Sequence, residues 1–366
     1  MKKCLLHVTA SLQRTSAAEQ MCLLVRGLPP DSFDVHVCAL ARGGPLAADL
    51  EAAGVPVHPI RRRWQLDPQA FRQLRRHVAR LRPDVIHGWL PLANAYALAA
   101  AKACGVKRLV AGLGFTEPGC GWCRKAVDHY VWRHCSVVVV RGPNQRDLYV
   151  RRGLSREKIR VIPYGVVPTT SNGLTRGQLL GELGLPEESR LIGLVGRLRR
   201  QARIKDAIWA ADLLKVIRDD VHLLVVGDGP HRDRLRRFRD QVVIRDKVHF
   251  LGDRDDASRL MPHLDVLWST GVGNAKSHAV MEAMAAGVPV VAADGPDLRE
   301  LISPQKTGYL VPAGDRAGIA RCTNKLLDDA ELAQQMGQAG RRRIEREFHA
   351  EQMIDQYAGL YRGLAE

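Results

Sequence analysis

One stretch in the second half of the chain constrains the fold more than any other. An apolar run, Val266–Ser269, leads into a glycine-broken segment, Gly271–Gly273. A segment rich in alanine and methionine follows from about Asn274 to Ala286, and then come Gly287 and a second apolar run, Val288–Ala292. The pattern predicts a strand, a loop, a helix that ends at a glycine, and a buried strand. Successive strands joined through a helix indicate a parallel α/β sheet.

The start of the predicted helix has the properties of a ligand site. The free N–H groups of a first helical turn carry about half a positive charge, and a glycine loop lets a ligand approach the backbone. At the helical period, Asn274, Ser277, His278, Met281 and Glu282 share one stripe. A carboxylate two turns into the helix can accept hydrogen bonds from paired hydroxyls, as on a ribose. We therefore predict a phosphate or nucleotide site, although an ordinary strand–helix–strand unit would have the same pattern.

This stretch resembles the donor-site signature of glycosyltransferase family 4, whose members are retaining enzymes with the GT-B fold. The family has a glutamate, seven residues, a second glutamate, and then Ala-Met-Ala-x-Gly-x-Pro-Val. The segment Glu282–Val290 matches from the second glutamate onward, whereas Asn274 replaces the first glutamate and Ala275 replaces the glycine after it. The resemblance implies an α/β protein of two Rossmann-like doubly wound domains that face a cleft.

The expected domain boundaries follow from length, composition and this resemblance. A chain of 366 residues suits two domains of ordinary size. We expect an acceptor-side domain over 1–165, a linker rich in proline, threonine and glycine over 166–188, and a nucleotide-sugar-binding domain over 189–347. The resemblance further implies that residues 348–366 form a C-terminal helix that crosses back to the first domain.

A pair of cations binds the donor diphosphate in this family. A Gly-Arg pair after a strand is followed, five residues beyond the arginine, by a lysine. Arg197 matches the arginine, but Ala202 occupies the lysine position, and Arg203 and Lys205 are the nearby cations that we expect to contribute. A charge-assisted hydrogen bond contributes about 1.5–3 kcal/mol, so the loss of one contact would weaken donor binding ~10- to 100-fold.

The resemblance implies further donor contacts around the same region. Glycines in the next loop would leave room for a nucleotide, a short backbone segment would hold the base, and the start of the helix would contact phosphate and sugar. Besides Glu282 on the ribose, these positions are Gly227, Gly229, Leu251, Ser277, His278, Ala279 and Val280.

His87 is the candidate reactive residue of the first half. It lies in a predicted strand and loop over Pro83–Trp89, and family members have a histidine at the end of this strand, beside the cleft. The resemblance implies that His87 and Asn274 contact the transferred sugar on either side and that Glu282 completes the catalytic set. A hydrogen-bonded histidine at a strand end is the alternative interpretation.

The resemblance implies transfer of a hexose from a nucleotide diphosphate sugar to a glycan or lipid-linked acceptor, with retention of anomeric configuration. The nucleotide sugar is a co-substrate, and no cofactor or metal is expected. However, Ser16, Ala17, Ala202, Asn274 and His278 replace residues common in the family. Their clustering in one functional region keeps open a catalytically degenerate binding or scaffold protein. An isomerase that acts on nucleotide sugars is a third alternative.

Net charge is concentrated in the first half of the chain. The whole chain has 55 Lys and Arg and 39 Asp and Glu. Residues 1–170 contain 26 basic and 11 acidic residues, whereas residues 171–366 contain 29 basic and 28 acidic residues. The densest parts are Arg61–Trp64 and a predicted basic amphipathic helix, Phe71–Arg82. Such a surface should attract an anionic acceptor or membrane, although a solvated crossover helix is the alternative. Nucleic acid is disfavoured because stacking aromatics are not interleaved with the basic residues.

We expect the protein to be cytoplasmic. We also expect it to attach peripherally to the inner face of the membrane and to act in the synthesis of cell envelope polysaccharide. No apolar run reaches the ~20 residues of a membrane-spanning helix.

Eight cysteines are scattered along the chain, and only Cys120 and Cys123 are closely spaced. With His129, His134 and Cys135 they suggest a zinc site, but the spacing fits no standard zinc pattern. A redox pair is a second possibility. Reduced thiols in a cytosolic protein are the interpretation that we favour.

Overall fold

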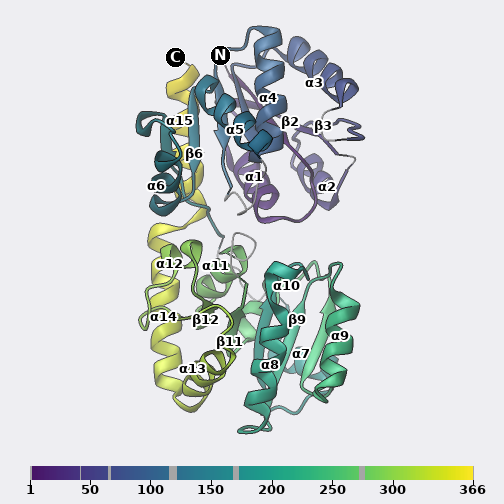
Figure 1. The fold of residues 1–366 in the computed structure, drawn as a ribbon, viewed down its shortest axis with the longest axis vertical. Helices are drawn as coiled ribbons and strands as arrows, with labels where there is room; N and C mark the ends of the chain where they lie inside the picture. The colour runs from purple at the N-terminus through teal and green to yellow at the C-terminus, as the bar shows by residue number, and fades with distance from the viewer. Residues whose placement is uncertain are drawn as a thin grey trace. The chain divides into compact units, whose positions relative to one another are not determined.

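A computed structural model describes residues 2–41, 43–64, 67–114, 122–167, 173–271 and 277–365. The chain divides into two compact units: Met1–Gly165 with Ala350–Glu366, and Val166–His349 (Figure 1). The C-terminal segment thus belongs to the first unit. Residues 173–188, which we had assigned to a linker, belong to the second unit and include a helix.

Among the described residues, the first unit contains a seven-stranded sheet in the order β3-β2-β1-β4-β5-β6-β7. All of its strand pairs are parallel, which confirms the predicted doubly wound sheet. The valine run of β6 is buried throughout, as expected of a strand covered on both faces. The strands are β1 (Lys3–Thr9), β2 (Phe33–Ala39), β3 (Val57–Pro59), β4 (Val85–Trp89), β5 (Leu109–Gly112), β6 (Val137–Val140) and β7 (Ile159–Val161).

Helices cover both faces of this sheet. One core contains Leu6 from β1, Ile86 from β4, and Leu74 and Val78 from α3. The last helix, α15, packs against α1, where a Cβ on Gly27 would lie 2.2 Å from the Ile354 side chain. The helices are α1 (Ser16–Gly27), α2 (Pro45–Ala52), α3 (Pro68–Leu81), α4 (Leu90–Cys104), α5 (Trp122–His134), α6 (Pro143–Arg151), the 3-10 turn η1 (Arg156–Lys158) and α15 (Ala350–Ala365).

The second unit has, within its described residues, a six-stranded parallel sheet in the order β10-β9-β8-β11-β12-β13. The strand order reverses between β8 and β11, which is where open α/β sheets bind ligands, at the carboxyl ends of the strands. The strands are β8 (Arg190–Val195), β9 (Val221–Val226), β10 (Val248–Gly252), β11 (Val266–Ser269), β12 (Val290–Ala293) and β13 (Tyr309–Val311).

The helix that follows β11 is α11 (Ser277–Ala285), and Gly287 after it has φ +77°, as a C-terminal glycine requires. The predicted strand–helix–strand order is therefore confirmed in the described part of this segment. The other helical elements are α7 (Arg176–Leu183), η2 (Arg200–Ala202), α8 (Ile204–Lys215), α9 (Arg232–Gln241), α10 (Ala257–Leu260), η3 (Met261–His263), α12 (Pro296–Leu301), α13 (Arg316–Asp328) and α14 (Ala330–Glu347).

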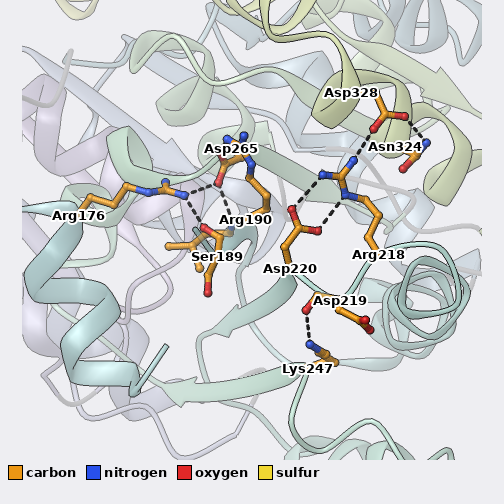
Figure 2. A network of polar contacts seen from close by, with 11 residues as sticks. Arg176, Ser189, Arg190, Arg218, Asp219, Asp220, Lys247, Asp265, Asn324 and Asp328 are labelled. Carbon is orange, nitrogen blue, oxygen red and sulfur yellow. Dashed lines mark hydrogen bonds and ion pairs between the residues drawn. The ribbon is translucent and has the colours of Figure 1, made fainter. Parts of the chain in front are cut away.

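A network of ion pairs and hydrogen bonds connects residues at the amino ends of the strands of the second sheet (Figure 2). Asp265, just before β11, accepts hydrogen bonds from Arg176 at the start of α7 (2.8 Å) and from Arg190 at the start of β8 (3.1 Å). Nearby, Arg218 pairs with Asp220 at 2.9 Å. The Arg176–Asp265 pair connects α7 to the sheet at the end opposite the predicted ligand site.

Candidate functional site

The carboxyl ends of β8 and β9 continue into two loops that pack on each other. The N–H of Gly196 donates to the carbonyl of Val226 (3.0 Å), and the N–H of Leu198 donates to the carbonyl of Asp228 (3.0 Å). The structure therefore brings Arg197 to the same sheet edge as Gly227 and Gly229. Residues 272–276, which connect β11 to α11 and include Asn274, lie outside the described residues.

The two loop glycines are explained by this packing. Gly227 has φ +120°, and a Cβ there would lie 2.4 Å from the carbonyl oxygen of Gly196. A Cβ on Gly229 would lie 2.6 Å from the carbonyl oxygen of Leu198. The absence of a Cβ at both positions therefore allows the two loops to pack closely, and the expected contact of these glycines with a nucleotide stays a prediction.

Arg197 is an exposed cation at the carboxyl end of β8. Its side chain forms no hydrogen bond or ion pair with a described residue, whereas other arginines of this unit, such as Arg176 and Arg254, pair with carboxylates. A guanidinium held at a sheet edge without a protein partner can bind an anionic ligand.

The other two predicted cations are engaged within the fold. Arg203 Nε lies 2.7 Å from Asp206 Oδ2, and Arg316 Nε lies 2.8 Å from the other oxygen of this buried carboxylate. Lys205 Nζ lies 4.5 Å from the centre of the Phe238 ring, in a cation–π contact. Because both side chains have partners within the fold, the structure gives no support to the expected replacement of the missing lysine by Arg203 or Lys205, which stays a prediction.

Ala202, at the position of the family lysine, is part of the core. Its side chain is only 7% exposed, and its carbonyl accepts a hydrogen bond from the buried Thr270 hydroxyl at 2.9 Å. A lysine in the same backbone conformation would have to leave this apolar environment to reach a ligand.

Glu282 on α11 is oriented by a neighbour that the sequence analysis missed. Its Oε1 accepts a hydrogen bond from Ser258 Oγ on α10 at 2.6 Å, and His278 Nε2 lies 3.6 Å from the same oxygen. The Glu282 side chain is 14% exposed, and its Oε2 has no hydrogen bond to a described residue. No spacing in the sequence links residues 258 and 282, so only the fold reveals this pair.

The rest of the predicted helical stripe is divided between the core and the site. Ser277 is the first residue of α11, Ala279 is half-buried, and Val280 and Met281 are fully buried. Val280 can therefore offer only backbone atoms to a ligand.

Leu251 is the extra residue of a β-bulge in β10. Phe250 pairs with Val225 of β9 and Gly252 pairs with Val226, so Leu251 has no pairing partner. A bulge leaves the backbone of the extra residue outside the ladder, which suits it to hydrogen-bond the edge of a ligand.

His87 lies within the predicted strand, but its side chain is buried. It is the third residue of β4, its side chain is 1% exposed, and its Nδ1 shares a 2.7 Å hydrogen bond with the Tyr361 hydroxyl of α15. The ring stacks 4.6 Å from Trp89, and burial, helped by the neighbouring His7, lowers the pKa of His87 far below its usual value. Within its unit, His87 is a buried histidine with a hydrogen bond to α15, which agrees with the alternative interpretation, and its contact with the transferred sugar stays a prediction.

The loop after β1 leads into a capped helix. Thr15 is the N-cap of α1 and accepts a hydrogen bond from the N–H of Ala18 at 3.4 Å. Ser16 and Ala17, which replace family glycines, are therefore the first residues of α1, and both are half-buried.

The basic helix α3 is amphipathic, as predicted. It buries Ala70, Leu74 and Val78, and it exposes Arg72, Arg75, Arg76 and Arg80, none of which has an ion pair with a described residue. Trp64, before the helix, is 65% exposed. The apolar face of α3 therefore belongs to the core of the first unit, and its basic face is exposed to solvent.

The predicted zinc site can be assessed only in part. Cys120 and the side chain of Cys123 lie outside the described residues. Cys135 is buried, and its burial raises the pKa of its thiol to about 11. His129 and His134 are exposed, and His134 Nδ1 bonds the carbonyl of Tyr130. Nothing described joins these three residues into one ligand set.

Comparisons with known proteins agree with this architecture. The model of the glycosyltransferase family 4 matches residues 17–170, and that of the glycosyl transferases group 1 matches residues 176–343. N-acetyl-alpha-D-glucosaminyl L-malate synthase of Bacillus anthracis is 31% identical over 185 residues, which is 50% of this chain and 48% of that enzyme. The match therefore spans about half of that relative's length.

Other matches extend over nearly the whole chain. The putative glycosyltransferase EpsD of Bacillus subtilis is 25% identical over 90% of this chain and 89% of its own. The crystal structure of Anabaena HepE in complex with UDP-glucose superposes with a TM-score of 0.87 at 21% identity, covering 98% of this chain and 99% of that one.

The two parallel α/β units have the GT-B fold. The chain belongs to the glycosyl transferases group 1, or glycosyltransferase family 4.

Proposed function

We propose that the chain transfers a hexose from a nucleotide diphosphate sugar to a glycan or lipid-linked acceptor, with retention of anomeric configuration. The observation that carries this proposal is the set of polar groups at the carboxyl edge of the second sheet: Arg197 without a protein partner and Glu282 with one carboxylate oxygen held by Ser258. The complex of HepE with UDP-glucose makes UDP-sugars the first donors to test.

In the proposed complex, Glu282 accepts hydrogen bonds from the ribose hydroxyls, and Arg197 and the start of α11 bind the diphosphate. The bond between the sugar C1 and the diphosphate breaks, and C1 bonds to an acceptor hydroxyl, which loses its proton. The leaving diphosphate gains negative charge as the bond breaks, so a fixed guanidinium stabilises the transition state more than the ground state. Asn274 is proposed to contact the sugar through its amide, and no metal is needed for this arrangement.

The test is calorimetric titration of the purified chain with UDP-glucose, UDP-N-acetylglucosamine and GDP-mannose. We expect dissociation constants well below millimolar for at least one donor, and a weaker value for Arg197→Ala. Absence of binding for all three at millimolar donor would favour the degenerate scaffold. Release of an altered nucleotide sugar without acceptor would favour the isomerase instead.

Retention of configuration requires a separate measurement. With an active donor–acceptor pair, NMR of the product's anomeric proton distinguishes the two stereochemical outcomes. An inverted anomer would overturn this part of the proposal while leaving donor binding intact.

We further propose that the basic face of α3 attracts an anionic membrane or acceptor at the inner side of the membrane, in the synthesis of cell envelope polysaccharide. The support is the row of unpaired arginines on α3 beside the exposed Trp64. In the described part of the chain, no helix combines the length and apolarity needed to cross a bilayer.

Vesicle sedimentation tests this attachment. Binding should rise with the fraction of phosphatidylglycerol and fall as salt is added, because exposed charges are screened within ~10 Å at 0.1 M salt. Arg75→Glu with Arg76→Glu should abolish it, whereas indifference to both lipid charge and salt would reject the proposal.

A further inference from the structure

A second cluster of reactive side chains lies in the first unit, at the amino ends of β1 and β2. Cys4 pairs with Asp34 across these strands and Leu6 pairs with His36. Because side chains alternate along a strand, Cys4, Asp34 and His36 share one face. Their nearest ligand atoms all lie within 4.8 Å of one another. The cluster lies at the opposite end of the strands from the edge where α/β sheets bind their ligands.

We propose that Cys4, Asp34 and His36 bind a divalent transition-metal ion of the zinc type, with water in the fourth position. The Nε2 of His36 and the Oδ2 of Asp34 are 3.3 Å apart. Two ligands that each bind zinc at ~2.0–2.1 Å with tetrahedral geometry are also about 3.3 Å apart. The Sγ of Cys4 makes only a long contact with the carbonyl of Leu81, at 3.9 Å, so a small rotation frees it for the metal.

The surroundings of His36 match those of a metal-bound imidazole. Such a histidine usually donates its other ring N–H to a fixed acceptor. The Nδ1 of His36 lies 3.4 Å from the Nε2 of His58, whose ring in turn packs 4.8 Å from His77. A neutral His58 ring can accept that proton at its Nε2, and the stacked His36 and His58 rings, whose centres are 5.6 Å apart, keep the two nitrogens facing each other.

The charges at the site also favour a cation. A ligand oxygen of Asp34 lies within 4.8 Å of Cys4 Sγ, and Asp84 Oδ2 accepts the Cys4 N–H at 2.8 Å, so two carboxylates are near the sulfur. A bound divalent ion displaces the thiol proton to solvent and neutralises the thiolate and carboxylate.

The ligand set indicates the class of metal. One sulfur, one imidazole nitrogen and one carboxylate oxygen suit zinc or a similar transition metal, whereas magnesium and calcium prefer oxygen ligands alone. Asp34 is 57% exposed in its side chain and His36 is 13% exposed, so an ion can reach the site from solvent. The metal would cross-link β1 and β2 and stabilise the first unit.

The test uses the full chain carrying Cys120→Ser and Cys123→Ser, so that this closely spaced pair of cysteines cannot bind the metal. The protein is stripped with a chelator and titrated with Co²⁺. We expect one equivalent of Co²⁺ to produce a thiolate-to-cobalt charge-transfer band in the near ultraviolet, and Zn²⁺ to abolish it by displacement. Zn²⁺ alone should raise the unfolding temperature.

Single variants in the same background assign the ligands. Cys4→Ser should remove the charge-transfer band, and Asp34→Asn and His36→Gln should each weaken binding at least tenfold. Cys322→Ser, which removes a half-buried thiol of the second unit, is the matched control and should change nothing. Asp34→Asn alters an exposed side chain, so its folding is not in doubt. Absence of one-to-one binding, or equal binding in Asp34→Asn and the background protein, would overturn the proposal.

Discussion

Glu282 accepts a 2.6 Å hydrogen bond from Ser258, a residue of the short helix α10 that the sequence does not associate with it. The bond fixes one carboxylate oxygen of the largely buried Glu282 side chain, which is 14% exposed, and so defines its orientation as an acceptor. A preoriented carboxylate loses less conformational entropy when it binds hydroxyl groups.

Substitution of Glu282 should therefore weaken donor binding most in this region. Because a hydrogen bond to a charged group contributes about 1.5–3 kcal/mol, Glu282→Gln should raise the dissociation constant of UDP ~10- to 100-fold. Ser258→Ala should raise it only a few-fold, because it removes the orientation and not the acceptor. Calorimetric titration measures both, with the exposed Glu187→Gln as control. Equal affinity in all three variants would contradict the ribose assignment.

Arg197 and Arg199 provide a matched comparison on one loop, since both are exposed arginines two residues apart. Arg197→Ala should weaken UDP binding ~10- to 100-fold through loss of a charge-assisted contact with the diphosphate. Arg199→Ala should leave it nearly unchanged. Titrations at two salt concentrations should show a smaller salt dependence for Arg197→Ala than for the parent chain. A similar loss from both substitutions would indicate a general charge effect.

Arg203 should affect stability and not donor affinity. Its guanidinium is one of two that bind the buried carboxylate of Asp206, so Arg203→Ala removes an ion pair at the start of α8. Arg203 also has φ +49°, a left-handed conformation that costs a non-glycine residue roughly 1 kcal/mol, and Arg203→Gly should recover part of the loss. Urea unfolding measures the three proteins. A tenfold loss of UDP affinity in Arg203→Ala would restore this residue to the donor site.

The fold was largely predictable because apolar runs and glycine breaks reflect burial directly. The strands β11 and β12 and the helix α3 lie within a few residues of their predicted bounds. Helices α5 and α9 were missed: α9 is rich in arginine and aspartate, and Leu235 is its only fully buried residue, so its apolar stripe is too short to detect. Its helical state depends on packing against the sheet, which local sequence does not report.

The site was less predictable because side-chain direction and pairing depend on tertiary structure. A histidine pattern cannot distinguish a ring at a strand end from one beneath α15, as with His87. Likewise, no spacing rule reveals that Arg316 binds Asp206 or that Lys205 lies over Phe238. For Arg197 and Glu282 the motif predicted the position, at the end of a strand and on a helix, and the structure places them there after β8 and on α11, while their contact with a donor stays a prediction.

The loop packing predicts that alanine substitution lowers stability at one glycine and leaves it unchanged at another. Gly227→Ala places a Cβ 2.4 Å from the Gly196 carbonyl at φ +120°, so it should lower stability by about 1–3 kcal/mol and displace the loop that carries Arg197. Gly295→Ala is the control, because a Cβ there meets no atom within 4 Å. Thermal unfolding and UDP titration measure both effects. Unchanged stability in Gly227→Ala would show that the two loops can separate.

The buried histidines of the first unit predict an acid-sensitive fold. Trp89 Nε1 donates to His7 Nδ1 at 3.0 Å, and burial lowers the pKa of His7 to about 3. The unfolded chain therefore takes up this proton more readily than the folded chain. The contribution of neutral His7 to the free energy of unfolding should be fully present above about pH 6.5 and should decline as the pH falls toward about 3. His87, with its pKa lowered in the same direction, should add to this decline.

Removing these rings with their partners should flatten the pH dependence. We expect His7→Leu with Trp89→Phe, and His87→Leu with Tyr361→Phe, to lose less stability than the parent chain between neutral pH and about pH 5. Each double variant replaces both members of a buried hydrogen bond, so neither leaves an unpaired polar atom behind. Urea unfolding at each pH gives the free energies, and His129→Gln, at an exposed position, should follow the parent curve. Parallel curves for all four proteins would mean that other groups, such as His222 and His249, control the acid response.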